Sequence, residues 1–394
     1  MQAPGAPPSR SSGRRAILAV AVGAVAIDSA LLGLIAPLLP AIEERTGAGE
    51  AELGIALAAY AVPIALLSLP LGRAADRFGR KGLLVAGLLV VAGGSAMIAF
   101  SDSLEALIAA RVIQGIGSAA SWISALALVS DTAQPGLRGQ SLGFALAATG
   151  VGSIAGPALG GVTADLLSYE APFLIALAGA LAVMVAALVL LPRGERQTRP
   201  AAPAFSVIVS TMRSGNGAWA AAIIMLSAGV LGLVEVVAPL DLDERLGLST
   251  SAIGLLFAGS IAVDAACSPL GGRWGDRRGR LSPALAGLAL TALCAALLAV
   301  LPGLGGAAIA LAVYGAGFAF AFAAAVPWLD EAFEERERGL AYGVQNLLYA
   351  VGYVVGPLLG GWLLELGGAE LSYWLTASAV AAVAALLAFA RPTA

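Results

Sequence analysis

The chain contains no histidine, only two cysteines and very little charge among its 394 residues. Histidine is the side chain whose ordinary pKa lies nearest neutrality, so proton transfer in this protein has to use carboxylates. Cys267 and Cys294 lie within apolar stretches and give no disulfide framework, and we expect them to be packing residues. The phosphate-binding pattern G-x-x-x-x-G-K-[ST] is also absent, which argues against ATP hydrolysis. We expect no enzymatic activity, cofactor, metal ion or nucleic-acid partner.

Charged residues make up only 12% of the chain and hydrophobic residues 59%, against about 25% and about 45–50% in soluble domains. A bilayer core about 30 Å thick needs about 20 apolar residues per helix. Twelve stretches have this length, so the sequence predicts an all-α membrane protein with twelve transmembrane helices. The predicted helices occupy residues 16–40, 51–72, 82–100, 104–130, 139–166, 171–192, 216–240, 250–272, 281–301, 304–329, 339–364 and 371–391.

Basic residues are nearly absent from one side of the predicted membrane. With the N-terminal tail at residues 1–15 in the cytoplasm, only Arg45 and Arg245 lie outside, and Arg111 lies within a helix. All other lysines and arginines then fall on the cytoplasmic side, as the positive-inside rule requires. We therefore predict a multi-pass protein of the cell (plasma) membrane with both termini in the cytoplasm.

The chain divides into two related halves. A polar, proline-containing linker at residues 193–214 separates six predicted helices in 16–192 from six in 215–391. Residues 138–161 and 338–361 align without gaps and share the pattern G-x-x-x-G-P-x-L-G-G. Because both copies begin on the same side of the membrane, the halves are predicted to be parallel six-helix repeats, which are typical of one transporter architecture.

Three motifs identify that architecture more closely. Glycine-rich, charged loops recur after the second helix of each half, as LGRAADRFGRKG at 71–82 and GGRWGDRRGR at 271–280. The fourth helix contains ARVIQGIGSA at 110–119, and the fifth contains the glycine and proline pattern described above. In these motifs the chain resembles the major facilitator superfamily, and the resemblance extends over nearly the whole sequence.

The resemblance implies the major facilitator fold and assigns roles to the motifs. The loop motif would form a cytoplasmic gate with a charge relay, to which Asp330 is a further candidate in the second half. The fifth-helix pattern resembles the motif of proton-coupled antiporters, although small residues four apart also suit any close-packed membrane helix. The implied gate and relay residues are Gly72, Asp76, Arg77, Gly79, Arg80, Asp131, Gly272, Asp276 and Arg280. The implied antiporter residues are Gly152, Gly156, Pro157, Gly160 and Gly161.

Four ionisable residues lie well inside the predicted helices: Asp28, Arg111, Glu235 and Asp264. A charge at the membrane centre costs at least about 2.5–3.5 kcal/mol, so each is a candidate for binding substrate or protons. Asp28 lies near the midplane, where transporters of this type bind their substrates. One carboxylate there can hold either a proton or a cation, and this mutual exclusion can produce antiport.

The segments around Asp28 and Glu235 are similar to the first and seventh helices of vesicular amine transporters, which favours a cationic or amine-like substrate. Glu235 is predicted about five residues from the outer end of its helix, as a functional carboxylate or as one reached by water in a vestibule. Asp264 is either a second proton site or a hydrogen-bonding partner of a neighbouring helix. The resemblance assigns Arg111 to proton transfer or gating, and the alternative is a hydrogen bond to helix carbonyls.

Polar and aromatic side chains inside the helices are candidates for lining a central cavity. Aromatic faces suit organic cations, although single aromatic residues in helices also serve in packing. The candidates are Tyr60, Trp122, Tyr314, Gln345, Asn346 and Tyr349.

These observations predict a proton-coupled antiporter that exports a small organic compound, cationic or amphipathic, as a monomer in the lipid bilayer. One alternative is a proton-coupled transporter of a neutral or anionic metabolite such as a sugar or amino acid. Uptake by symport and a membrane receptor without transport activity are further alternatives. Two intact gate loops argue against the receptor, because a static protein has no evident need for them.

Overall fold

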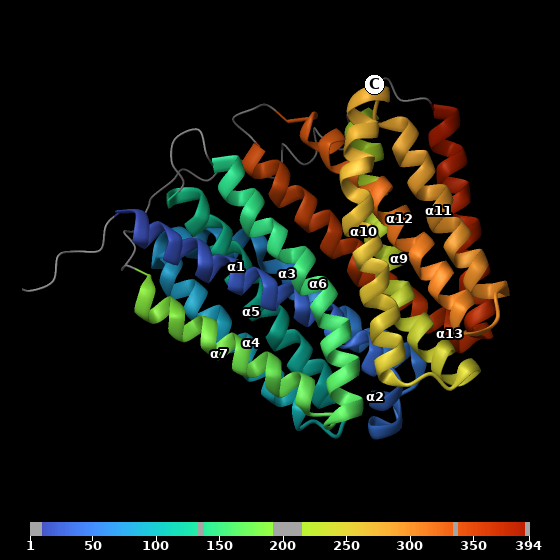
Figure 1. Cartoon of the computed structure of the whole chain (residues 1–394), viewed down its shortest axis with the longest axis horizontal. Helices are drawn as coiled ribbons and strands as arrows, with labels where there is room; N and C mark the ends of the chain where they lie inside the picture. The colour runs from blue at the N-terminus through green and yellow to red at the C-terminus, as the bar shows by residue number, and fades with distance from the viewer. Residues whose placement is uncertain (1–9, 133–137, 192–214, 334–337, 391–394) are drawn as a thin grey trace, which may run out of the picture.

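The computed structural model describes residues 10–132, 138–191, 215–333 and 338–390 (Figure 1). The described residues form helices and their connections and contain no strand, which confirms the predicted all-α fold. Ten stretches among them are long and apolar enough to cross a membrane. The predicted linker at 193–214 and most of the predicted tail at 1–15 lie outside the described residues.

The helices form two bundles, coloured blue to green and yellow to red in Figure 1. The first bundle contains α1 (Arg10–Leu34), α2 (Leu39–Thr46), α3 (Glu50–Phe78), α4 (Arg80–Ala99), α5 (Leu104–Thr132), α6 (Arg138–Leu166) and α7 (Ala171–Leu190). The second contains α9 (Gly215–Leu246), α10 (Thr250–Arg278), α11 (Leu281–Val300), α12 (Gly303–Asp330) and α13 (Arg338–Ala390). Non-helical backbone at Gly367 and Gly368 divides α13 into two segments, so it supplies the last two predicted helices.

Several helices differ from their predicted extents. α3 and α10 continue past their predicted ends to Phe78 and Arg278, so most of each segment predicted as a gate loop is helical. The stretch predicted at 16–40 is broken after Leu34 by a short 3-10 helix, Ala36–Leu38, and the short α2 follows. Pro37 lacks the backbone N–H that a continuous helix would use at that position. The helix predicted to end at residue 240 instead continues to Leu246. Its last turns are polar and do not register as an apolar stretch, but they remain helical.

Glycines join helices within each half. A Cβ atom added at Gly152 of α6 would lie 2.2 Å from the carbonyl oxygen of Ala26 on α1, and one at Gly156 would lie 2.2 Å from that of Ala30. The seam of the second half, between residues 352–360 of α13 and α9, repeats this packing. Only glycine permits such close approach of two helix backbones.

Glycines also join the two halves, and these contacts lie at the end of the molecule that holds α2, which we call the α2 end. A Cβ at Gly54 of α3 would lie 2.3 Å from the carbonyl oxygen of Pro357 on α13. A Cβ at Gly254 of α10 would likewise lie 2.3 Å from that of Pro157 on α6. In Figure 1 the bundles converge toward this end, beside the label of α2.

At the opposite end, ion pairs form within each half. In the first half the Nε atom of Arg80 lies 2.8 Å from an Asp131 carboxylate oxygen, and both side chains are largely buried. In the second half Arg280 contacts Asp276 at 2.8 Å and Glu331 at 3.2 Å. These pairs therefore strengthen the individual bundles and do not tie one bundle to the other.

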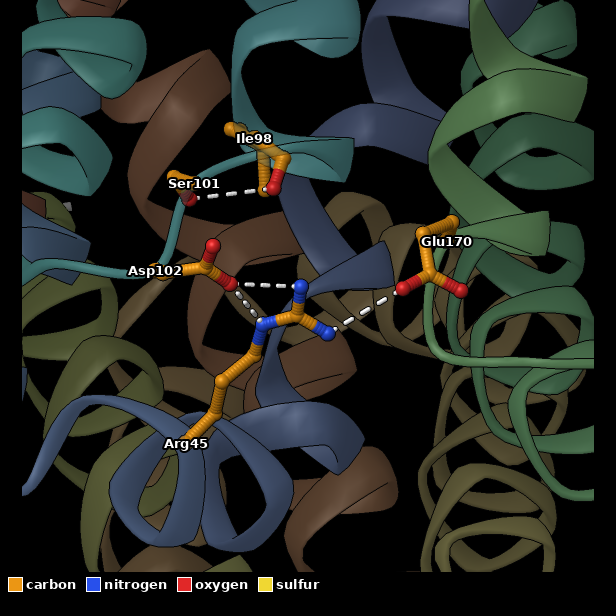
Figure 2. Close-up of polar contacts among 5 residues, drawn as sticks. All are labelled: Arg45, Ile98, Ser101, Asp102 and Glu170. Atoms are coloured by element: carbon orange, nitrogen blue, oxygen red, sulfur yellow. Dashed lines mark hydrogen bonds and ion pairs between the residues drawn. The ribbon is translucent and has the colours of Figure 1, made fainter.

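Arg45 anchors the loops of the first half at the α2 end (Figure 2). Its guanidinium donates to Asp102 at 2.8 Å and to Glu170 at 3.1 Å, and it stacks 4.7 Å from the ring centre of Tyr169. Hydrogen bonds from the Glu170 backbone and from Ser168, together with Arg45, hold the pKa of Glu170 below its usual value. One side chain therefore connects α2 with the α4–α5 and α6–α7 loops.

We predict that Gly54→Leu opens the α2 end, because a side chain at this position cannot share space with the Pro357 carbonyl. Spin labels at Leu167→Cys and Leu304→Cys, which are exposed at this end in opposite halves, would report the separation after Cys267 and Cys294 are replaced by alanine.

The matched control is Gly93→Leu, since a Cβ at Gly93 meets no atom within 4 Å. The label distance should increase in Gly54→Leu and stay unchanged in Gly93→Leu. Equal distances in all three proteins would contradict the role of this contact.

Candidate functional site

Asp28 lies on α1 beside the seam that the fifth-helix motif forms. The carbonyl groups that Gly152 and Gly156 touch belong to Ala26 and Ala30, the residues two before and two after Asp28. The motif glycines therefore fix the depth and rotation of the helix segment that carries the carboxylate. The motif therefore packs directly against the segment of α1 that carries Asp28.

The carboxylate of Asp28 has partners from two other helices. The hydroxyl of Tyr60 on α3 donates to Asp28 Oδ1 at 3.2 Å and lies 2.9 Å from the Ser118 hydroxyl on α5. Tyr60 and Ser118 are each 1% exposed. A buried carboxylate needs such donors, because desolvation without hydrogen bonds is costly. The arrangement can hold a proton or compensate a cation at Asp28.

Arg111 on α5 stacks over the Tyr60 ring, with its guanidinium 4.4 Å from the ring centre. It is 1% exposed and donates through Nη1 to Gln114 at 3.0 Å. Gln114 in turn donates to Ser95 on α4 at 3.0 Å. The Nε and Nη2 atoms of Arg111 have no hydrogen-bond partner in the structure. The contact with a side-chain amide differs from the predicted alternative of helix carbonyls.

Glu235 on α9 is a buried carboxylate of the second half, seven residues beyond Ala228, which the 200-residue repeat aligns with Asp28. It is 4% exposed and accepts a short hydrogen bond from the hydroxyl of Tyr353 on α13. Because α9 continues to Leu246, Glu235 lies deeper than the five residues from the helix end that the sequence predicts. Glu235 and Arg111 also attract each other electrostatically across the two halves. Its burial makes a water-exposed vestibule carboxylate the wrong description for this structure.

The two carboxylates lie on either side of the seam between the halves. A buried cluster contains Ala61 of α3 together with Ala228 of α9 and Tyr353 of α13, with Leu32 of α1 packed against it. Tyr60 is the chain neighbour of Ala61, and Tyr353 is the partner of Glu235. Rocking of the bundles would therefore change the surroundings of both carboxylates at once.

Asp264 is held apart from this pair on α10, where it accepts a hydrogen bond from Ser268 of the same helix at 3.0 Å. Tyr314 and Tyr349 each interact electrostatically with both Asp264 and Glu235. The Tyr314 hydroxyl is buried without a partner. The observed bond is within one helix, unlike the predicted bond to a neighbouring helix.

A row of aromatic rings extends from Glu235 across the second half. The sequence patterns did not predict these rings as one connected feature. Tyr353 stacks with Tyr349, which contacts Phe322 edge to face at a centroid distance of 6.1 Å. Phe322 stacks on Phe318 at 5.1 Å, and Phe318 contacts Tyr314. The signal was available, because residues 314, 318 and 322 and residues 349 and 353 are spaced by four and share a helix face.

The remaining predicted residues lie in several environments. Trp122 packs against an apolar cluster of the first half, whereas Gln345 and Asn346 on α13 are half-buried. The side chain of Asp76 and the surroundings of Gly72 lie outside the described residues, and Arg77 is exposed.

The gate motif of the second half is described more fully. A Cβ at Gly272 meets no atom within 4 Å, so this motif glycine has no close neighbour in the present conformation. Arg280 contacts Glu331, the residue after the suggested Asp330. Among the described residues, no group of three acidic, histidine or cysteine side chains is placed to hold a metal ion.

Comparison with known proteins identifies the family. The model of the Major Facilitator Superfamily matches residues 18–240 and 220–394. The chain belongs to the Major Facilitator Superfamily. The resemblance inferred from the motifs is thereby confirmed, and the protein is a multi-pass membrane transporter and not an enzyme.

Several relatives of this superfamily member are named as resistance proteins or transporters. Multidrug resistance protein 1 of Bacillus subtilis (strain 168) is 26% identical over 367 residues, which cover 92% of this chain and 93% of the relative. The tetracycline resistance protein, class C, of Escherichia coli is 29% identical, and the match covers 87% of this chain and 88% of the relative. The MFS-type transporter SLC18B1 of Mus musculus is 27% identical, and the match covers 86% of this chain and 77% of the relative.

Solved structures show the same fold at low identity. The nucleoside transporter NupG superposes with a TM-score of 0.77 at 14% identity and covers 96% of this chain and 98% of its own. A bacterial homologue of the human lysosomal transporter Spinster gives a TM-score of 0.75 at 18% identity. The superposition covers 98% of this chain and 96% of the homologue. These likenesses establish the arrangement of the helices alone.

We predict that Gln114→Leu destabilises the protein by about 1–3 kcal/mol, because it leaves the Arg111 Nη1 donor buried without an acceptor. Thermal unfolding in detergent would show a lower melting temperature. Gln345→Leu removes an amide from a half-buried position and is the control, with a smaller change expected. A melting temperature in Gln114→Leu equal to that of the wild type would contradict the assigned contact.

Proposed function

We propose that this transporter is a proton-coupled antiporter that exports a small organic compound, cationic or amphipathic. The observation that carries the proposal is the placement of Asp28 and Glu235, which lie buried on either side of the seam between the halves. Each is bonded to a tyrosine hydroxyl, from Tyr60 and Tyr353 respectively. With Arg111 nearby, the three groups sum to one negative charge when all are ionised, since 1 − 2 = −1.

A net negative charge is costly in an apolar interior. The site is therefore more stable when it binds a cation or a proton than when it is empty. A cationic substrate at Asp28 stabilises the ionised carboxylate and displaces its proton. Protonation from the opposite side of the membrane removes the charge that holds the substrate. Exchange of the two therefore follows from competition for one carboxylate, with Glu235 as a second proton site or a relay.

The aromatic rings of the second half support an organic substrate over a simple ion. Phe318, Phe322 and Tyr349 are half-buried and form a continuous aromatic surface that leads to Tyr353 and Glu235. Rings of this kind attract organic cations through their faces and also contact apolar groups. The resistance proteins among the relatives agree with an organic compound as the substrate class.

The predicted orientation gives a direction to the cycle. Because basic residues concentrate at the end opposite α2, we assign that end to the cytoplasm and the α2 end to the outside. The close inter-half contacts then close the outer end, and the conformation is inward-facing. In the outward-facing state the gate motifs around Arg80 and Arg280 would meet across the halves, with Gly72 and Gly272 permitting the approach.

Flux measurements test the proposal. Purified protein in liposomes with a pH gradient would be challenged with tetraphenylphosphonium, a neutral sugar and an acidic metabolite. We expect the cation to evoke proton movement in the wild type and in Glu105→Gln, an exposed acidic control, and none in Asp28→Asn. Coupled flux of tetraphenylphosphonium that persists in Asp28→Asn would contradict the role of this carboxylate.

A second candidate function rests on Arg111. Its buried Nε and Nη2 donors have no partner, and a carboxylate or carbonyl group of a neutral or anionic metabolite would satisfy them. In that case Asp28 would handle protons only. Flux evoked by the sugar or acidic metabolite, and not by the cation, would favour this function.

A further inference from the structure

The fourth-helix motif ARVIQGIGSA places a buried cation against an aromatic ring. Arg111 donates through Nη1 to Gln114 at 3.0 Å, and Gln114 is fixed in turn by its bond to Ser95 on α4. A Cβ at Gly115 would lie 2.1 Å from the Tyr60 carbonyl oxygen, so this glycine allows α3 to pack directly on α5. The motif therefore sets the positions of both the guanidinium and the ring beside it.

Tyr60 holds this cation apart from the carboxylate of Asp28. The Tyr60 hydroxyl donates to Asp28 Oδ1 at 3.2 Å, while the Arg111 guanidinium lies over the ring at 4.4 Å from its centre. Within the described ranges, Arg111 forms no ion pair with Asp28 or with Glu235. Opposite charges attract strongly in an apolar interior and would gain from direct pairing. Their separation by one side chain leaves a negative and a positive point that one ligand can bridge.

One edge of the Arg111 guanidinium has no partner. The side chain is 1% exposed, and its Nε and Nη2 atoms are buried without a hydrogen-bond acceptor in the described structure. These two nitrogens form one edge of the planar group, and their parallel N–H bonds match the two oxygens of a carboxylate. Buried donors without acceptors are costly, so binding a carboxylate at this edge would be favourable.

Arg45 shows how the same edge is satisfied elsewhere in this chain (Figure 2). Its Nη1 contacts Glu170 at 3.1 Å, as Nη1 of Arg111 contacts Gln114. Its Nε and Nη2 atoms both contact Asp102 Oδ1, at 2.8 Å and 2.6 Å respectively. The edge that a carboxylate occupies in Arg45 is thus the edge that has no partner in Arg111.

An apolar and aromatic surface adjoins the two charges. Leu32 lies one turn beyond Asp28 on α1 and packs against the buried cluster at the seam between the halves. Tyr349 of the aromatic row packs against the same cluster, which contains Ala61 and Tyr353. The aromatic row of the second half therefore reaches the seam beside the turn of α1 that follows Asp28. Rings of a ligand held between the two charges would find apolar and aromatic contacts there.

We propose that the preferred substrate is a zwitterion: an aromatic compound whose cationic group binds at Asp28 and whose carboxylate binds the Nε–Nη2 edge of Arg111. A lone anion at Arg111 would be repelled by the nearby carboxylates, whereas a zwitterion places each of its charges against the opposite charge. Arg111 is then a residue that determines specificity. This inference rests on the proposed function, from which it takes the cation site at Asp28, and it adds the second charge of the substrate.

The test compares the binding of two dyes that differ in one group. Rhodamine B carries a carboxylate and is a zwitterion near neutral pH, whereas its ethyl ester has the same rings and only the positive charge. Purified full-length protein in detergent would be dialysed to equilibrium against each dye, with protein-free micelles as the blank. We expect the wild type to bind rhodamine B more tightly than the ester.

Arg111→Gln should affect the two dyes differently. Loss of a charge-assisted bond should weaken the binding of rhodamine B by about 10- to 100-fold. Binding of the ester should stay unchanged or become tighter, because the substitution removes a positive charge that repels it. Retained binding of the ester also shows that the variant is folded.

Two further variants serve as controls for Arg111→Gln. Arg278→Gln removes an exposed arginine at the end of α10 and should bind both dyes as the wild type does. Arg111→Lys retains the charge but lacks the planar edge, so it should recover only part of the affinity for rhodamine B.

A wild type that binds the ester as tightly as rhodamine B, or more tightly, would overturn the proposal, and this comparison needs no variant. An equal loss of both dyes in Arg111→Gln would also overturn it. Asp28→Asn tests the proposed function separately, because it should weaken the binding of both dyes. If Asp28→Asn weakens neither dye, the proposed function fails together with this inference. If Asp28→Asn weakens both dyes and Arg111→Gln leaves the preference for rhodamine B unchanged, this inference alone fails.

Discussion

Burial of charge in an apolar interior is the constraint on which this structure depends. A carboxylate or guanidinium inside a membrane protein must find hydrogen-bond partners within the protein, because lipid supplies none. Asp28 uses Tyr60, Glu235 uses Tyr353, and Arg111 uses Gln114 and the face of Tyr60. Except for Gln114, which shares α5 with Arg111, these partners come from other helices, so the buried charges help to hold neighbouring helices together. Two nitrogens of Arg111, Nε and Nη2, have no such partner in the described structure.

The internal repeat provides rigid bodies for this chemistry. Glycine seams lock α1 to α6 and α9 to α13 at backbone contact, while ion pairs around Arg80 and Arg280 and the Arg45 network hold the ends of each bundle. Relative motion of two such bundles would change the contacts at the seam between them, where the two buried carboxylates lie. The two halves also meet through a side chain: the Asp165 carboxylate of the first half accepts a hydrogen bond from the Ser251 backbone N–H of the second.

Much of this could be predicted from the sequence, because membrane helices and buried charges leave strong patterns. The all-α fold, the family, and the isolation of Asp28, Arg111, Glu235 and Asp264 within helices follow from hydropathy, motifs and charge. The depth of Glu235 was underestimated because hydropathy marks the end of the apolar stretch and not the end of the helix. The bonds to Tyr353 and Ser251 join residues 118 and 86 positions away in the chain, and no local pattern specifies such pairs.

Competition between a proton and an organic cation for the buried carboxylates is the central claim. Its most direct measurement is proton release when tetraphenylphosphonium binds to purified protein in weakly buffered detergent near neutral pH. Binding should release protons from the wild type and none from the Asp28→Asn/Glu235→Gln double variant. Binding of the cation to the wild type without proton release, or equal release from the double variant, would contradict it.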